Sequence, residues 1–148
     1  MIIDDFRGDY AFLSNFFPCH IRMNGINYRN AEAAFQSFKL ADPEERRRFS
    51  KLTPSEAKRL GRSVTLRPDW ESIKIDTMRA VVHLKFLENR PLARLLIATG
   101  DAELIEGNTW HDTFWGVCNG VGQNNLGKIL MAERERQKHR FSENKVRR

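Results

Sequence analysis

Two carboxylates in distant parts of the chain are the residues best suited to acid–base chemistry. Glu32 lies four residues before Gln36 and seven before Lys39 in a segment with helical periodicity, and Asp112 lies in an aromatic stretch much further along. A pair of carboxylates can move a proton and stabilise a developing cation across one bond. Each also has a structural alternative, which is a surface Glu–Lys helix pair for Glu32 and a turn role for Asp112.

Residues 106–125 form the second segment whose composition suggests a site. Two of the three tryptophans and four of the nine glycines lie here, and no helical period is sustained. Tryptophan offers a flat face to a planar ring, and glycine lets the backbone approach a ligand closely. The segment leads into a predicted helix whose free N–H groups favour an anion such as phosphate. Arg134, on the core side of that helix, is expected to meet either an anionic ligand or a carboxylate in an ordinary ion pair.

Other reactive arrangements are poorly supported by spacing. His111 and Cys118 would suit a base and a nucleophile, but nothing places Cys118 at a helix N-terminus, so a small buried thiol is the simpler interpretation. The four histidines stand at 20, 83, 111 and 139 without ligand spacing, so we expect no metal site. The glycines at 120 and 122 lack the third glycine and the βαβ unit of a dinucleotide fingerprint.

A β-hairpin is predicted before Glu32. Residues 19–23 and 26–28 alternate apolar and polar side chains on either side of Asn24-Gly25. This dipeptide supplies the positive φ angles of a type I′ turn, which is a strong short-range hairpin signal. One face of the hairpin should therefore pack on the rest of the chain.

A helix that starts near Asn30 is expected to carry Glu32. Its apolar residues recur at i, i+3, i+4 and i+7, and the polar residues Glu32, Gln36 and Lys39 form a second stripe beside them. The two stripes lie side by side at about 100° per residue, so the polar row can line the edge of a pocket.

Helices are predicted for much of the remaining chain. Their signals are Pro43 before a charged run, a capping box over residues 53–56, a longest helix over 69–89, a helix over 91–100 and a final helix over 126–140. Gly61 is expected to end the helix that starts at the capping box, and Asn124 or Asn125 to cap the last helix. A short strand is expected at 104–106. Because the few strands do not alternate with the helices, the predicted fold class is helix-rich α+β.

Length and composition indicate one globular domain in a reducing, cytoplasmic setting. The chain has 148 residues, 41% hydrophobic and 30% charged, with two cysteines, no apparent signal peptide and no apolar run long enough to span a membrane. The formal net charge is +6, of which residues 133–148 supply four units. We therefore expect a domain over residues 1–140 and a basic tail over 141–148, which is either solvated or a nucleic-acid contact.

Five blocks of residues, in order along the chain, share one resemblance. They are Phe12-Leu13-Ser14-Asn15-Phe16, Ala31-Glu32-Ala33-Ala34-Phe35-Gln36 with Lys39, Trp70-Glu71-Ser72-Ile73-Lys74 with Met78-Arg79, Asp112-Thr113-Phe114-Trp115-Gly116, and Asn124-Asn125-Leu126-Gly127 with Leu130-Met131 and Arg134. Together they resemble the NADAR family of YbiA-like proteins over about residues 6–136. The resemblance is specific because all five blocks occur in the same order, whereas no single block would identify the family.

The resemblance implies a compact α+β domain that hydrolyses an N-glycosidic bond without a metal or redox cofactor. Some members act on the ribosylamino-pyrimidine phosphates of early riboflavin biosynthesis, and others are associated with ADP-ribose, including its removal from guanine. By position in the blocks, Glu32 and Asp112 are the implied catalytic residues. The implied substrate-binding residues are Arg7, Asn15, Gln36, Lys39, Trp70, Trp115, Gly116, Asn124 and Arg134.

The mechanism expected from this resemblance passes through an oxocarbenium-like ribose. Glu32 would activate water or stabilise the cation, Asp112 would be its partner or anchor the ribose, and the division of roles stays open. The tryptophans would stack the base, and Lys39, Arg134 and the turn at 120–124 would hold phosphate. Residues 116–123 vary within the family. The resemblance therefore indicates which type of bond is cleaved but not which substrate carries it.

The expected partner is a small phosphorylated nucleoside-like substrate, with riboflavin intermediates as the first candidates. The alternatives are removal of ADP-ribose from guanine in DNA and a non-catalytic module that binds ADP-ribose or a related nucleotide. A further alternative is a nucleic-acid-binding protein, suggested by the charge and by Arg46-Arg47-Arg48. No membrane partner is expected, and the oligomeric state is open.

Overall fold

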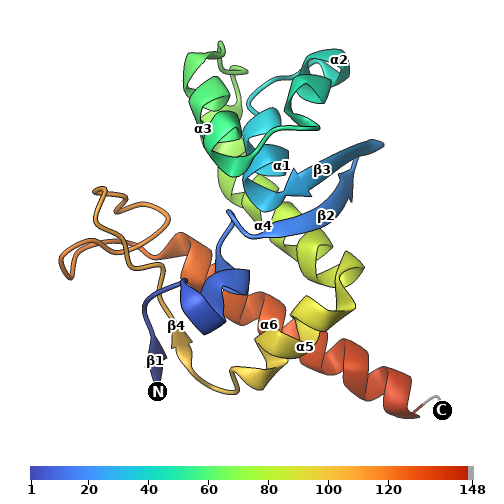
Figure 1. The fold of residues 1–148 in the computed structure, drawn as a ribbon, viewed down its shortest axis with the longest axis vertical. Helices are drawn as coiled ribbons and strands as arrows, with labels where there is room; N and C mark the ends of the chain where they lie inside the picture. The colour runs from blue at the N-terminus through green and yellow to red at the C-terminus, as the bar shows by residue number, and fades with distance from the viewer. Residues whose placement is uncertain (147–148) are drawn as a thin grey trace. The chain divides into compact units, whose positions relative to one another are not determined.

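A computed structural model describes residues 1–146, and the chain forms two compact units. Residues 15–89 form the middle unit, and residues 1–14 together with residues from 90 onward form the terminal unit. Each unit has its own sheet and its own helices (Figure 1).

The predicted hairpin is the sheet of the middle unit. Strands β2 (Pro18–Met23) and β3 (Ile26–Asn30) pair antiparallel, with a register irregularity between Pro18 and Ile21. Asn24 and Gly25 take positive φ angles of 50° and 81°, as the type I′ turn requires. Alternate residues of both strands are buried, so one face of the hairpin packs on the unit as expected.

Helix α1 (Ala31–Ser37) is wholly buried and lies at the centre of the middle unit. It starts where predicted, because the side chain of Asn30 accepts a hydrogen bond of 2.7 Å from the N–H of Ala33. Both strands of the hairpin and helices α3 (Pro54–Ser63) and α4 (Trp70–Glu88) pack on it, as Figure 1 shows. The polar stripe of α1 is therefore covered by protein rather than exposed at a surface.

The remaining helices of the middle unit follow their predicted start signals. Helix α2 (Pro43–Arg46) leads into a 3-10 turn, η2 (Arg47–Phe49), and the capping box of Thr53 and Glu56 opens α3. The expectation that Gly61 ends α3 was wrong, since the helix continues to Ser63. Gly61 keeps a helical backbone and faces the side chain of Gln36, so its role is to leave space rather than to stop the helix.

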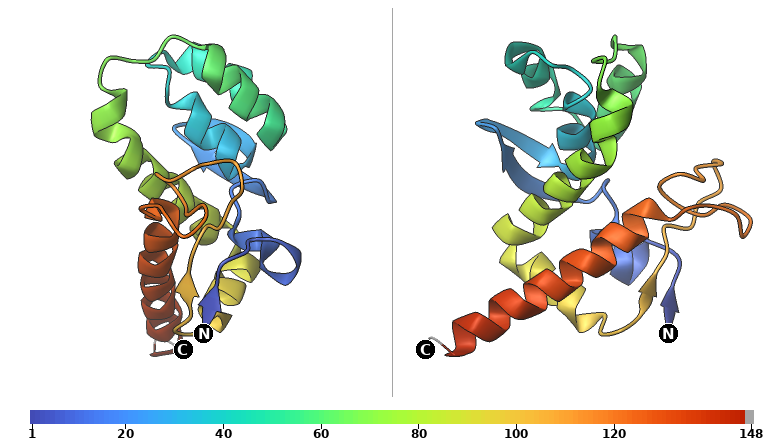
Figure 2. Two further views of the ribbon diagram at one scale, coloured as in Figure 1. Left: turned by 90° about the vertical axis from the view of Figure 1, so that its left-hand side faces the viewer. Right: turned by 180° about the vertical axis from the view of Figure 1, so that it is seen from behind.

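The terminal unit is built on two long-range pairings. Strand β1 (Ile2–Ile3) pairs in parallel with β4 (Glu103–Leu104), and helix α5 (Arg90–Ala98) crosses and contacts α6 (Asn125–Val146) (Figure 2). A 3-10 helix, η1 (Gly8–Leu13), follows β1. The final helix is longer than predicted: it continues beyond residue 140 to Val146 and exceeds α4, which was expected to be the longest. The last two residues of the expected tail lie outside the described part of the chain.

The helix-rich α+β class is confirmed, with a β-hairpin near the N-terminus and few short strands. Both cysteines are free thiols. No helix within residues 1–146 is long and apolar enough to cross a membrane. Over the same described residues, no group of three or more histidine, cysteine or acidic side chains could hold a metal ion.

Candidate active site

The first turn of α1 holds Glu32 as a buried carboxylate, 8% exposed. The side-chain amide of Gln36, one turn further on, donates a hydrogen bond of 2.9 Å to its Oε1. The backbone N–H of Glu32 donates to the carbonyl of Asn15 at 3.1 Å, which ties the start of the helix to the segment before the hairpin. A hydrogen-bonded carboxylate in a low-dielectric setting is well placed to act on a positive charge.

Lys39 supplies a half-buried cation close to this carboxylate. Its Nζ donates to the carbonyl of Gly61 in α3 at 3.3 Å, and its own carbonyl accepts from the N–H of Arg67 at 2.8 Å. Burial lowers the pKa of Lys39, the charge of Glu32 opposes that shift and the nearby Arg62 adds to it. A second cation beside Lys39 is a feature that the sequence analysis missed.

Asn15 and Trp70 also lie in the middle unit, and both are buried. The amide of Asn15 donates to the sulfur of Met78 at 3.4 Å, and Trp70 packs on Phe35 with ring centroids 5.2 Å apart. Trp70 is 5% exposed, so its visible contribution is to the core around α1. Its stacking role stays a prediction.

In the terminal unit, Asp112 organises the aromatic loop. Its Oδ1 accepts hydrogen bonds from the N–H groups of Phe114 at 3.1 Å and Trp115 at 2.9 Å, and its backbone pairs with the side chain of Asn108. The structure therefore shows the turn role that was the alternative for this residue. Among the described residues, the other oxygen, Oδ2, accepts no hydrogen bond, so a catalytic role for Asp112 also stays a prediction.

Four consecutive N–H groups where the loop runs into α6 are already used within the terminal unit. Those of residues 123–126 donate to carbonyls of residues 113–116 at 2.7–3.3 Å. Gly116 takes part through its carbonyl, and a side chain on it would meet the backbone of Glu106. At the turn over 120–124, the N–H groups of Val121, Gln123 and Asn124 are therefore occupied, and the phosphate role of the turn stays a prediction. The ring of Trp115, partly exposed, lies edge-on to Phe114.

Asn124 ties the loop to the end of β4. Its Oδ1 accepts from the N–H of Glu106 at 3.0 Å, and its Nδ2 donates to the carbonyl of Leu104 at 2.9 Å. The side chain is buried, and both of its polar atoms are satisfied within the unit. Its role here is to anchor the loop rather than to cap α6 with its side chain.

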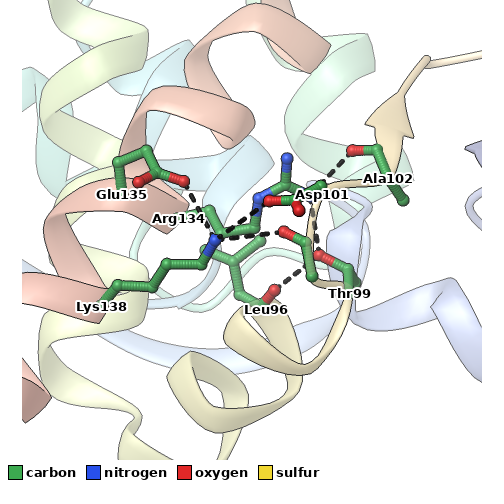
Figure 3. Close-up of polar contacts among 8 residues, drawn as sticks. Leu96, Thr99, Asp101, Ala102, Arg134, Glu135 and Lys138 are labelled. Atoms are coloured by element: carbon green, nitrogen blue, oxygen red, sulfur yellow. Dashed lines mark hydrogen bonds and ion pairs between the residues drawn. The ribbon is translucent and has the colours of Figure 1, made fainter.

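Arg134 makes no ion pair with a carboxylate of the described residues, and its binding of an anionic ligand stays a prediction. Its Nη1 donates to Thr99 Oγ1 at 2.9 Å and to the carbonyl of Ala102 at 2.8 Å, so it binds the chain just beyond α5 (Figure 3). Lys138, one turn later, donates to the carbonyl of Gly100 at 3.3 Å. Cations stabilise helix C-termini in this way, which gives Arg134 a structural function.

Two remaining side chains from the sequence analysis lie outside these networks. Arg7 is exposed and pairs with Asp5 at 2.8 Å, and that pairing lowers the pKa of Asp5. The sulfur of Cys118 lies 3.9 Å from Nδ1 of His111, with the thiol buried. This is a loose contact within the loop.

The middle unit thus joins Asn15, Glu32, Gln36 and Lys39 in one hydrogen-bonded and electrostatic group around α1, with Trp70 beside it through Phe35. The terminal unit holds Asp112, Trp115, Gly116, Asn124 and Arg134. The predicted partnership of Glu32 with Asp112 involves both units and stays a prediction. The sequence analysis took Gly61 for a helix end and missed its contact with Gln36, although a glycine kept inside a helix against its low propensity can signal close packing.

The fold belongs to a known class of protein. The profile of the NADAR domain matches residues 4–138, and the chain therefore belongs to the NADAR family. The solved structure of Escherichia coli YbiA is similar, with a TM-score of 0.83 and 34% sequence identity over 96% of this chain and 88% of that one.

Two named relatives are similar over most of this chain. A riboflavin biosynthesis protein of Vibrio vulnificus is 40% identical over 131 residues, which are 86% of this chain but 35% of that protein. The N-glycosidase YbiA of Shigella boydii is 39% identical over 131 residues, covering 86% of this chain and 81% of that protein. The chain thus spans about a third of the Vibrio relative and most of the Shigella one.

Proposed function

We propose that the chain hydrolyses the bond between ribose C1 and the amino nitrogen of a ribosylamino-pyrimidine phosphate, an early riboflavin intermediate. Hydrolysis of an N-glycosyl bond is supported by the relatives named N-glycosidase that are similar over most of the chain. The choice of substrate is supported by the Vibrio relative, which is named for riboflavin biosynthesis.

The buried Glu32 is the observation that carries the proposal. As the C–N bond breaks, positive charge develops on the ribose, and a fixed carboxylate stabilises it more in the transition state than in the ground state. Gln36 holds one oxygen of Glu32 at 2.9 Å, which leaves the carboxylate little freedom to turn away. Water adds its oxygen to C1, and its proton ends on the departing nitrogen, so the products are the sugar phosphate and the free aminopyrimidine.

Lys39 is proposed to bind the phosphate of the substrate. Its pKa is lowered chiefly by burial, and the neighbouring Arg62 lowers it further. An anion that binds next to Lys39 relieves the repulsion between these two cations. Asp112 is proposed as the second acidic group, on the resemblance and on the hydrogen-bonding capacity of its Oδ2.

Base release from a panel of N-ribosides tests the proposal. The panel contains a ribosylamino-pyrimidine phosphate, its dephosphorylated form and an ADP-ribosylated guanine oligonucleotide, and free base is measured by chromatography. We expect turnover of the phosphorylated pyrimidine, a loss of at least about 100-fold in kcat for Glu32→Gln, and no loss for the exposed Glu44→Gln. Turnover of the oligonucleotide alone would show that ADP-ribosylated guanine, and not the pyrimidine riboside, is the substrate. Full activity of Glu32→Gln would show that Glu32 is not catalytic.

A further inference from the structure

Gly61 lies in the third turn of α3, where it faces the side chain of Gln36. A Cβ built on Gly61 would overlap Gln36 Oε1 and would come 2.7 Å from its Cδ. The backbone of Gly61 is helical and its φ is not positive, so the conformation does not require glycine. What requires glycine at this position is the space that the amide of Gln36 occupies.

The amide of Gln36 is oriented from its two ends. Its Nε2 donates to Glu32 Oε1, whereas its Oε1 is buried and has no hydrogen-bond partner among the described residues. An ionised carboxylate accepts and cannot donate, so the amide must present its nitrogen to Glu32. The oxygen end is held by packing against Gly61 rather than by a hydrogen bond.

We propose that Gly61 is a positioning residue for Glu32, acting through Gln36, and this inference rests on the catalytic role proposed for Glu32. The open face of α3 at Gly61 lets the amide lie flat against the helix and reach the carboxylate. The carbonyl of the same residue accepts from Lys39 Nζ at 3.3 Å. One glycine thus supports both charged groups of the site, by space in one case and by its backbone in the other.

Gly61→Ala separates these two contributions. The added methyl meets the far end of a flexible side chain, so the amide of Gln36 moves and the two helix backbones keep their places. The 2.9 Å hydrogen bond to Glu32 is then lost, whereas the carbonyl that binds Lys39 remains. The substitution should therefore impair catalysis more than binding.

Steady-state kinetics on the phosphorylated riboside test this. We expect Gly61→Ala and Gln36→Ala each to lower kcat by about 10–100-fold with KM within about threefold, as expected for a misplaced reacting group. The double variant should match Gln36→Ala alone, because the methyl then fills the space that the amide has left. Ser55→Ala, on the exposed first turn of α3, is the matched control and should behave like the wild type.

The side-chain NH₂ signals of Gln36 in NMR spectra test the geometry without any substrate. In the wild type they should follow the protonation of Glu32 as pH is lowered, and in Gly61→Ala they should not. Lack of activity on every riboside would contradict the proposed function. The NMR measurement would then still test whether Gly61 positions the amide of Gln36. Unchanged signals in Gly61→Ala would overturn the inference, as would kinetic effects that add in the double variant. If Gly61→Ala does not fold, wild-type kcat in Gln36→Ala would overturn it equally.

Discussion

Asp112 combines a structural and a proposed catalytic role, and two substitutions can separate them. In Asp112→Asn, the amide oxygen still accepts from the N–H groups of Phe114 and Trp115, while the negative charge is lost. In Asp112→Ala, both acceptor bonds are lost. We expect Asn to keep the free energy of unfolding within about 0.5 kcal/mol of the wild type, and Ala to lower it by about 1–2 kcal/mol.

For activity, a catalytic role of Asp112 predicts a different ranking of the two variants than for stability. If Asp112 acts through its charge, Asp112→Asn should lose about as much kcat as Asp112→Ala, although its stability is retained. Chemical denaturation and turnover measured on the same preparations check this. Near wild-type turnover in Asp112→Asn would leave the residue with its turn function alone.

Candidate site residues could be predicted from the sequence more readily than the contacts that they make. Glu32 and Lys39 were nominated by motif and spacing, and the structure places them in one group. Arg134 was given an anionic partner because its position on the helix was known and its neighbours were not. Those neighbours, Thr99 and Ala102, lie more than 30 residues away in sequence, and no local pattern predicts such contacts.

At the scale of elements, Arg134 joins α6 to the end of α5. Arg134→Met keeps much of the side-chain volume but removes the hydrogen bonds to Thr99 and Ala102. We expect a loss of about 2 kcal/mol in unfolding free energy, measured by urea denaturation, because a buried carbonyl loses a charged donor. Lys138→Met, at a partly exposed position, should change stability by less than about 1 kcal/mol.

The same variant tests the phosphate role that the resemblance implies for Arg134. A purely structural arginine leaves KM unchanged for both the phosphorylated riboside and its dephosphorylated form. An increase of tenfold or more in KM for the phosphorylated form alone, with stability retained, would show that Arg134 binds substrate.

Helix α4 contains a fully buried lysine, Lys85, whose pKa is lowered by burial from 10.5 to about 8. Between these two values the unfolded chain holds a proton that the folded chain has lost, so this group makes stability rise with pH, by up to about 1.4 kcal/mol per pH unit. Burial raises the pKa of the nearby Cys19, which makes stability fall with pH in the alkaline range. The two effects must therefore be separated.

Cys19→Ala removes the opposing thiol, and Lys85→Met in that background removes the lysine. The quantity compared is the difference in unfolding free energy between Cys19→Ala and the double variant. We expect this difference to increase by about 1–2 kcal/mol in favour of Cys19→Ala as the pH is raised from 8 to 10. Urea denaturation at several pH values measures the difference. Parallel curves for the two proteins would show that Lys85 does not titrate in this range.

Elements with local signals were predicted well, whereas strand β1, which depends on pairing with a distant segment, was not predicted. The turn at Asn24-Gly25 and the capping box of Thr53 are set by residues within a few positions, so the hairpin and α3 could be recognised. Strand β1 has two residues and exists because β4, about 100 positions later, pairs with it. The end of α3 was misplaced because glycine was treated as a stop signal, whereas packing against Gln36 explains its presence.

At the scale of the whole molecule, four of the six units of net positive charge lie in residues 133–148, on α6 and the tail. Part of the basic charge on α6 is paired, since Arg136 lies 3.7 Å from Glu133 and Lys138 lies 3.1 Å from Glu135. The ring of Phe141, within the expected tail, stacks with two guanidinium groups, whose Cζ atoms lie 4.9 Å (Arg90) and 5.0 Å (Arg140) from its centroid. Phe141, at the start of the expected tail, therefore contacts other residues of the terminal unit.

Truncation after Ser142 keeps the Phe141 stack and removes only the end of the tail. Because the family profile ends at residue 138, we expect kcat/KM for the small phosphorylated riboside to stay within about twofold of the full chain. The full chain and the truncated chain are also compared on an ADP-ribosylated oligonucleotide at two salt concentrations. If the tail binds nucleic acid, only the oligonucleotide loses turnover, and the loss is larger at low salt, where each phosphate contact contributes most. A tenfold loss on the small substrate would instead make the last residues part of the catalytic domain, because a distant cationic tail cannot change the reaction of a ligand that it does not touch.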